Sequence, residues 1–215
     1  MTGSSPTIPA TVSESLAGWI AALDFDRLPV DVVRMARRCL LDTLGCALQG
    51  STTPEAVLFR HVRDDLGGTG PCTVWGTPGG VAPQAAALLN GTHAYLRELD
   101  DIGGGGHAGA CQMPAAMGAA ELTGADGEAV LLGLVAGHEI ASRLTDAASY
   151  DTMTLHGWHT TGVYGAFGAA AAAARVMGLD AAGTAHTLGL AGSYVGGTWA
   201  FMADGAMSKR VHPGR

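Results

Sequence analysis

The hydrophobic residues of this chain recur mainly at the three- and four-residue spacing of an amphipathic helix. Near the start, Leu16, Trp19, Ile20 and Leu23 fall on one face of such a helix. A second apolar pattern begins after Pro29, a residue that the first turn of a helix accepts, and it continues as a longer segment. The chain therefore opens with two predicted helices.

The same spacing, together with glycine and proline breaks, predicts helices along most of the chain. They span residues 12–23, 29–50, 54–66, 82–98, 113–122, 127–148, 160–177 and 180–192. Asp126 is expected to cap the helix that follows it. Residues 165–174 are almost wholly alanine and glycine, which indicates a central helix that its neighbours approach closely. Only residues 72–76 have a strand pattern, so an all-α fold with at most one or two short strands is predicted.

Composition and charge narrow the class of protein. The chain has 215 residues, 47% of them hydrophobic, which is enough for one domain with a sizeable core. Its formal net charge of -7 argues against nucleic acid or an anionic membrane as partner. We expect a disordered tail over residues 1–10 and one helical domain over residues 11–215. The tail has no basic start and no apolar core, so no signal peptide is expected and a cytoplasmic location is favoured.

Three polar clusters stand out in a chain that is only 14% charged. They are Glu98, Asp100, Asp101 and His107 around four glycines, His156 and His159 before the alanine-rich segment, and Lys209, Arg210, His212 and Arg215. A histidine near a carboxylate can act as a general acid or base at neutral pH. Lysine and arginine bind carboxylates. Together the clusters suit proton removal next to a carboxylate of a small polycarboxylic acid.

Each of these residues also has a structural interpretation. The four glycines at 103–106 can form a floppy surface loop after a solvated helix end. His93, His138 and His186 lie inside helical patterns, and we interpret them as structural. For His107 and His159 the catalytic and the structural interpretations both remain open at this point.

The sequence gives little support for a metal or an organic cofactor. The cysteines have neither CxxC pairing nor zinc spacing, and those at 39 and 46 fall in an apolar helical pattern that suits buried thiols. A facial triad of Asp101, His107 and His159 lacks the local spacing that usually accompanies one. The four glycines match neither GxGxxG nor a Walker motif. We therefore expect no metal and no cofactor.

At these clusters the sequence resembles the MmgE/PrpD family, whose members include 2-methylcitrate dehydratases, cis-aconitate decarboxylases and iminodisuccinate epimerases. The motifs that carry the resemblance, in chain order, are Leu40-Leu-Asp-Thr-Leu-Gly45, Thr73-Val-Trp-Gly76, Asn90-Gly-Thr with Asp100-Asp101, Gly157-Trp-His159 and Lys209-Arg-Val-His-Pro-Gly-Arg215. The resemblance implies a large helical domain that dimerises, with a cofactor-free active site facing a smaller α/β lid domain. It also implies that these 215 residues lack that lid, because the family's chains are much longer.

The resemblance further implies roles for single residues. Glu98 and Asp101 match the first and last aspartates of the family's DFDD motif, although Glu98-Leu-Asp-Asp-Ile102 replaces the usual Asp-Phe-Asp-Asp-Thr. The residues implied for catalysis are His107, His159 and Asp101, and those implied for substrate binding are Glu98, Lys209 and His212. One histidine would take the alpha proton, and Lys209 would hold a substrate carboxylate.

Three functions from different classes follow. The first is a cofactor-independent lyase or epimerase of a di- or tricarboxylate, such as a dehydratase or cis-aconitate-type decarboxylase, with a separate chain possible as the source of the lid. The second is a truncated helical scaffold without activity. The third is a module that binds small acids through residues 209–215.

Overall fold

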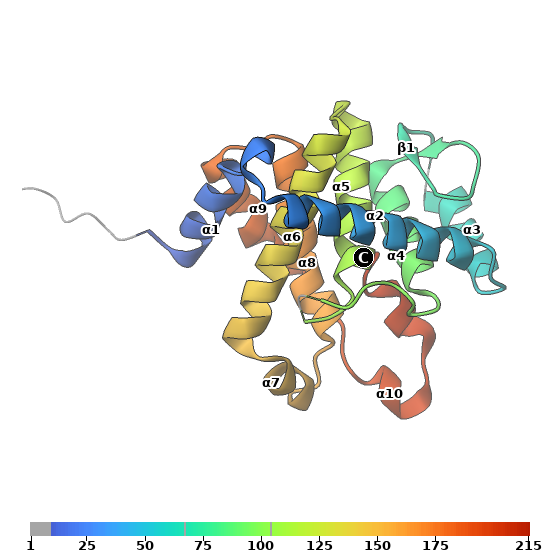
Figure 1. The fold of residues 1–215 in the computed structure, drawn as a ribbon. Coiled ribbons are helices and arrows are strands. Elements are labelled where there is room, and N and C mark those ends of the chain that lie inside the picture. The colour runs from blue at the N-terminus through green and yellow to red at the C-terminus, as the bar shows by residue number, and fades with distance from the viewer. Residues whose placement is uncertain (1–9, 67, 104) are drawn as a thin grey trace, which may run out of the picture.

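The computed structural model describes residues 10–66, 68–103 and 105–215, and over this part the chain is almost entirely helical (Figure 1). The elements are α1 (Val12–Ala21), η1 (Phe25–Arg27), α2 (Val30–Ser51), α3 (Ala56–Leu66), β1 (Cys72–Thr73), β2 (Gly80–Val81), α4 (Pro83–Tyr95), α5 (Ala108–Thr123), α6 (Gly127–Ala148), α7 (Tyr150–Leu155), α8 (Thr160–Val176), α9 (Ala181–Tyr194), α10 (Phe201–Asp204) and η2 (Met207–Val211). The predicted all-α class is confirmed. The tail expected over residues 1–10 lies outside the described residues, apart from the exposed Ala10.

Short polar side chains start several of these helices. The Thr11 side chain accepts a hydrogen bond from the Glu14 backbone N–H, and the Glu14 carboxylate accepts one from the Thr11 backbone N–H, which forms a capping box at α1. Asp126 accepts from the backbone N–H of Ala129 at 2.9 Å, so its predicted role as the cap of α6 is confirmed. These caps fix where the helices begin.

Helices α5, α6 and α8 pack together at the centre, and α2 crosses in front of them (Figure 1). Helices α1 and α9 lie together on one side, and α3, α4 and the two-stranded sheet lie on the other. Ala116, Ala136, Ala171 and Ala172 are completely buried between the central helices. Because these side chains are small, the helix axes approach at the short end of the usual separation. This confirms the prediction of an alanine-rich central helix.

The boundaries of several elements differ from the predictions. The strand at 72–76 is limited to Cys72–Thr73, and it pairs antiparallel with Gly80–Val81, which sequence reasoning missed. The helix predicted over 82–98 ends at Tyr95. Helix α5 begins at Ala108 rather than at residue 113, so that Pro114 lies inside the helix. That proline forgoes one backbone hydrogen bond, but packing of α5 against α4, α6 and α8 maintains the helix.

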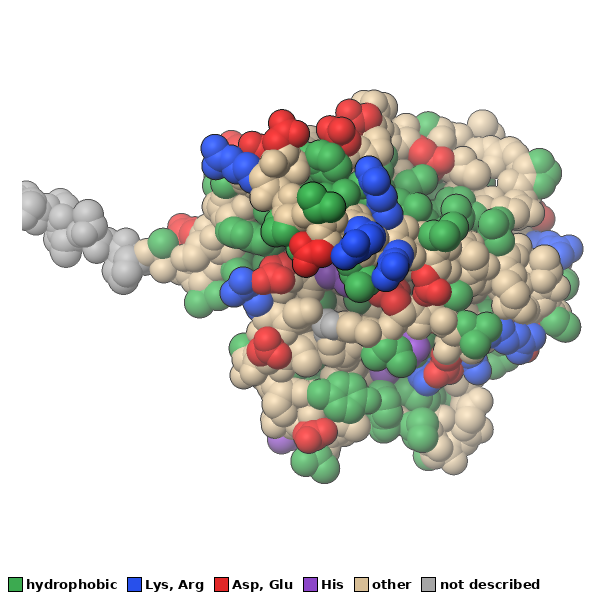
Figure 2. All heavy atoms as spheres, viewed as in Figure 1, with side chains coloured by type: hydrophobic (Ala, Val, Ile, Leu, Met, Phe, Trp, Pro, Cys, Tyr) green, Lys and Arg blue, Asp and Glu red, His purple; other side chains and the backbone are tan. Residues whose placement is uncertain are grey.

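The outward face of α2 combines apolar and basic side chains. Figure 2 shows Lys or Arg side chains gathered over the middle of α2 next to hydrophobic ones. Val30, Met35 and Leu41 are exposed on this helix, at 81%, 54% and 71%. The face is therefore more apolar than the outside of an ordinary amphipathic helix.

None of the helices in the described ranges combines the length and the apolar character that crossing a bilayer requires.

Candidate functional site

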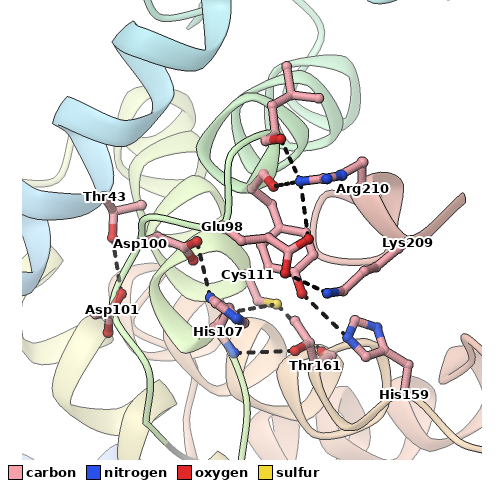
Figure 3. A network of polar contacts seen from close by, with 12 residues as sticks. Thr43, Glu98, Asp100, Asp101, His107, Cys111, His159, Thr161, Lys209 and Arg210 are labelled. Carbon is pink, nitrogen blue, oxygen red and sulfur yellow. Dashed lines mark hydrogen bonds and ion pairs between the residues drawn. The ribbon is translucent and has the colours of Figure 1, made fainter. Parts of the chain in front are cut away.

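A cavity of about 390 Å³ lies where the ends of several elements meet. Its walls are Tyr95, Ile102, Gly105, Gly106, His107, Tyr150, His159, Thr160, Thr161, Trp199 and Lys209. They come from the end of α4, the glycine-containing loop, α7, the start of α8 and the segment that carries η2. The structure thus brings His107, His159 and Lys209, which are far apart in the sequence, to one cavity (Figure 3).

His107 is oriented by a buried carboxylate. Its Nδ1 lies 3.1 Å from Oδ1 of Asp100, whose side chain is completely buried. Because an ionised carboxylate only accepts hydrogen bonds, Nδ1 carries the proton and Nε2 is left as the basic atom of the neutral ring. Burial raises the pKa of Asp100, and its hydrogen bond with His107 opposes that rise. Asp100 and His107 therefore form an acid–base pair of the kind used in proton transfer.

Two further contacts fix the His107 ring and backbone. The backbone N–H of His107 donates to the Thr161 hydroxyl at 3.2 Å. The Tyr95 ring meets the His107 ring edge-on, with centroids 4.7 Å apart. Gly106 has to be glycine here, because a Cβ atom on it would lie 2.5 Å from the Thr161 hydroxyl oxygen. The loop pairs on itself, with Gly103 N–H donating to Gly106 C=O at 2.9 Å, which argues against the floppy-loop interpretation for its described residues.

His159 is a buried, neutral histidine. Its Nδ1 lies 2.8 Å from Nδ1 of His212, and its Nε2 lies 3.5 Å from the Tyr95 hydroxyl. Its ring also packs against Trp199 and Phe201, with centroids 5.3 and 5.2 Å away. Burial, followed by the positive charges of nearby groups, lowers the pKa of His159 to about 3. The ring is therefore uncharged at neutral pH, and its surroundings disfavour its protonation.

Lys209 brings a positive charge to the cavity, and Glu98 holds it. Lys209 Nζ lies 2.5 Å from Oε2 of Glu98, and Arg210 Nη1 lies 3.1 Å from Oε1 (Figure 3). Arg210 also donates to the C=O of Leu96 at 2.5 Å, so it ties the end of α4 to η2. Glu98 has a φ of 52°, a backbone conformation that is uncommon for a residue other than glycine. Glu98 thus positions Lys209 and is not itself part of the cavity wall.

Two helix N-termini also meet at the cavity. His107 and His159 occupy the N-cap positions of α5 and α8, and in the described structure neither caps its helix with its side chain. The first-turn N–H groups of a helix attract anions. Thr160 and Thr161, in the first turn of α8, line the cavity. With Lys209 nearby, this end of the cavity is suited to a carboxylate.

Besides Glu98, the structure separates two predicted site residues from the wall of this cavity. Asp101 lies on the opposite side of the loop from Asp100, where it contacts the Thr43 hydroxyl at 3.5 Å and His138 Nε2 at 3.2 Å (Figure 3). His212 lies behind His159 and lines a different cavity, next to Arg215. These two residues thus lie outside the cavity wall, and the His212 ring contacts the wall residue His159.

Sequence reasoning selected Asp101 and passed over Asp100, although the two are adjacent. It also passed over Tyr95, Thr161 and Trp199, which line the cavity. For Thr161 a signal existed, because a hydroxyl residue at the start of an apolar helix directly after a histidine lies close to that histidine. For Asp100 no signal existed, since the choice between neighbouring carboxylates depends on the loop backbone.

His138, interpreted from the sequence as structural, also contacts a predicted site residue. Burial alone would lower its pKa, but hydrogen bonds with Asp101 and Cys39 outweigh that effect and raise the pKa to about 10. His138 therefore belongs to a second polar cluster, on the outer side of the acidic loop.

The fold and the cavity define a helical domain with a polar site that brings together two histidines, a buried carboxylate and a lysine. The model of the MmgE/PrpD N-terminal domain matches residues 14–215, and the chain belongs to this family. The resemblance seen in the sequence is thereby confirmed.

Named relatives are similar over nearly the whole chain. A cis-aconitate decarboxylase-like protein, oryM, of Aspergillus oryzae is 33% identical over 98% of this chain and 45% of its own length. The cis-aconitate decarboxylase of Aspergillus terreus is 29% identical over 94% of this chain and 43% of its length. The human cis-aconitate decarboxylase is 28% identical over 95% of this chain and 43% of its length. The chain thus spans less than half the length of these relatives.

Proposed function

We propose that this chain is the helical half of a cofactor-independent lyase that acts on a small di- or tricarboxylate, with decarboxylation of a cis-aconitate-like acid as the favoured reaction. The observation that carries the proposal is the meeting of His107, His159 and Lys209 in one cavity. The matched relatives named as cis-aconitate decarboxylases favour decarboxylation over dehydration.

Substrate binding is assigned to the cationic end of the cavity. Lys209 and the first-turn N–H groups of α8 would hold substrate carboxylates, because a lysine and a helix N-terminus both stabilise negative charge. Thr161 would add a hydroxyl hydrogen bond. Glu98 keeps Lys209 in place while no substrate is bound.

The two histidines are given different roles in the proposed reaction. Decarboxylation breaks a C–CO₂⁻ bond, leaves the electron pair on the carbon skeleton and requires one proton from an acid. His107 is assigned as that acid, because it lines the cavity and its Nδ1 lies 3.1 Å from the Asp100 carboxylate, which orients the ring. His159 stays uncharged at neutral pH, because burial lowers its pKa to about 3, and it is suited to hydrogen-bond the substrate rather than to take a proton from it.

We also propose two partners. Relatives of more than twice this length and the family resemblance together suggest an α/β lid, on the same chain or on a separate one, that closes the cavity and excludes water.

We further propose a homodimer that buries the outward face of α2, because Met35 and Leu41 expose apolar surface there.

The test is an assay in which NMR follows the turnover of candidate substrates. The protein, alone and with a lid domain supplied, is incubated with cis-aconitate, 2-methylcitrate and iminodisuccinate, without added metal. We expect consumption of one acid, loss of that activity in a His107→Ala/His159→Ala double variant, and full activity in a His186→Ala control. Unchanged turnover in the double variant, or a strict need for added metal, would contradict the proposal.

The same assay separates the alternatives. Interconversion of stereoisomers without loss of CO₂ or water would identify an epimerase. Binding of the acids in calorimetry without turnover would identify a binding module. If the lid-supplied protein neither binds nor converts any of the acids, the chain is a helical scaffold.

A further inference from the structure

A second cluster of reactive side chains lies on the outer side of the acidic loop, away from the cavity. It consists of Cys39 on α2, Asp101 on the loop and His138 on α6, and one ligand atom from each lies within 4.8 Å of the others. None of the three takes part in the reaction proposed above. A thiol, a carboxylate and an imidazole are the three side-chain types that bind zinc in proteins.

The orientation of His138 is the first indication of a metal ligand. Its Nδ1 lies 2.9 Å from the C=O of Leu134, and a carbonyl oxygen only accepts, so Nδ1 carries a proton. The other nitrogen, Nε2, lies 3.2 Å from Oδ2 of Asp101, which is also an acceptor when ionised. A proton or a cation must therefore lie between these two atoms. A histidine that binds a metal through one nitrogen almost always donates from the other to a carboxylate, a backbone carbonyl or water, and His138 has this arrangement.

The position of Asp101 is the second indication. Its Oδ1 lies 3.5 Å from the Thr43 hydroxyl, which leaves Oδ2 directed toward His138. Gly109 makes this placement possible, because a Cβ atom at that position would lie 2.1 Å from Oδ1 of Asp101. The carboxylate is thus fixed by its surroundings, as ligands of a bound metal commonly are.

The third indication is open space next to the cluster. Cys39 and His138 line a separate cavity of about 220 Å³, formed between α2 and α6. The side chains of His138 and Asp101 are 26% and 19% exposed, so an ion could enter. In tetrahedral zinc sites, neighbouring ligand atoms lie roughly 3.3–3.6 Å apart. The distance of 3.2 Å from Nε2 to Oδ2 is close to that value.

The geometry points to a zinc site formed by Cys39, Asp101 and His138, with a water molecule from the neighbouring cavity as fourth ligand. Zinc is favoured over magnesium or calcium because a thiolate and an imidazole are poor ligands for those ions. A bound ion would join α2, α6 and the loop, and it would fix the backbone next to Asp100. This inference concerns binding only and does not depend on the proposed function.

The experiment is a titration of the metal-free 215-residue chain with Co²⁺, followed by competition with Zn²⁺. Cobalt bound to a thiolate gives a charge-transfer absorption in the near ultraviolet. We expect one Co²⁺ per chain with this absorption, displacement by Zn²⁺, and a rise in melting temperature with Zn²⁺. Cys39→Ser should remove the absorption and weaken binding 100-fold or more, since even the partners of metal ligands are worth about 10- to 100-fold.

Cys46→Ser is the matched control, because Cys46 is also half-buried on α2 and should leave both absorption and affinity unchanged. A second measurement avoids any variant that fails to fold: in the unmodified chain, Zn²⁺ should protect Cys39 from alkylation and leave Cys46 reactive, as read by peptide mapping. Absence of the thiolate absorption, or equal alkylation of Cys39 with and without Zn²⁺, would overturn the inference. The cluster would then be only a partly buried ion pair of His138 and Asp101.

Discussion

Asp100 and Asp101 are neighbours of the same chemical type, yet they serve two different sides of the molecule. Asp100 is completely buried and contacts His107 at the cavity. Asp101 is 19% exposed and contacts His138 between α2 and α6. The loop backbone directs these two neighbouring side chains to opposite sides. The comparison shows that the backbone conformation alone can place two adjacent, identical side chains in different environments with different partners.

The largest expected effect is a difference in turnover between variants of the two carboxylates. Asp100→Asn keeps the shape of the side chain but removes the charge that supports His107, so we expect turnover to fall by about 10²- to 10⁴-fold. Asp101 lies on the other side of the loop, so the turnover of Asp101→Asn should stay within about tenfold of that of the unmodified chain. Steady-state kinetics of both variants with the active acid checks this prediction. Equal losses in both would mean that the two sides act as one site.

The next effect concerns substrate binding on the cavity side. Lys209→Met removes the cation and keeps a similar length, so the dissociation constant for a dicarboxylate should rise about 10- to 100-fold, as expected for one charged hydrogen bond. Arg63→Met, which removes a cation far from the cavity that bonds the Pro78 carbonyl, is the control and should leave binding unchanged. Calorimetry measures both. An unchanged affinity in the Lys209 variant would remove this residue from the site.

The cavity side should also be sensitive to acid. The pKa of His159 is lowered by burial, chiefly, to about 3. Folding therefore disfavours protonation of His159. The free energy of unfolding falls as the pH drops below about 6.5, the pKa of a histidine in the unfolded chain. At pH 5 the loss is on the order of 2 kcal/mol.

Urea unfolding at pH 7 and pH 5 tests this acid sensitivity. His159→Gln should lack that part of the pH dependence, because glutamine does not titrate. The exposed His61 provides the control, and His61→Gln should retain the full pH dependence. A pH dependence in His159→Gln that equals that of the wild-type chain would show that His159 is not buried as described.

The smallest effect is expected on the outer side. Thr43→Val keeps the shape but removes the hydroxyl that contacts Asp101. The free energy of unfolding should fall by about 1 kcal/mol or less, because one neutral hydroxyl donor at 3.5 Å contributes little. Turnover should not change. A loss of activity comparable with that of Asp100→Asn would mean that the outer side controls the cavity.

Much of the fold followed from local pattern. The apolar spacing of Leu16, Trp19 and Ile20 predicted α1, and Asp126 predicted the start of α6, because both signals act within a few residues. The end of α4 was wrong by three residues. Glu98 is not helical but adopts a positive φ, and there it bonds Lys209 and Arg210, which lie more than a hundred residues later in the chain.

The sequence by itself determined the helical class, the alanine-rich centre, the family and the identity of His107, His159 and Lys209 as candidates. Helical periodicity and short motifs carry that information because they depend on neighbouring residues. Only the tertiary structure decided that Asp100 rather than Asp101 supports His107, that His212 stands behind His159, and that Cys39 meets His138. Those outcomes depend on the loop backbone and on the packing of α2, α5, α6 and α8, which bring together side chains that no local pattern relates.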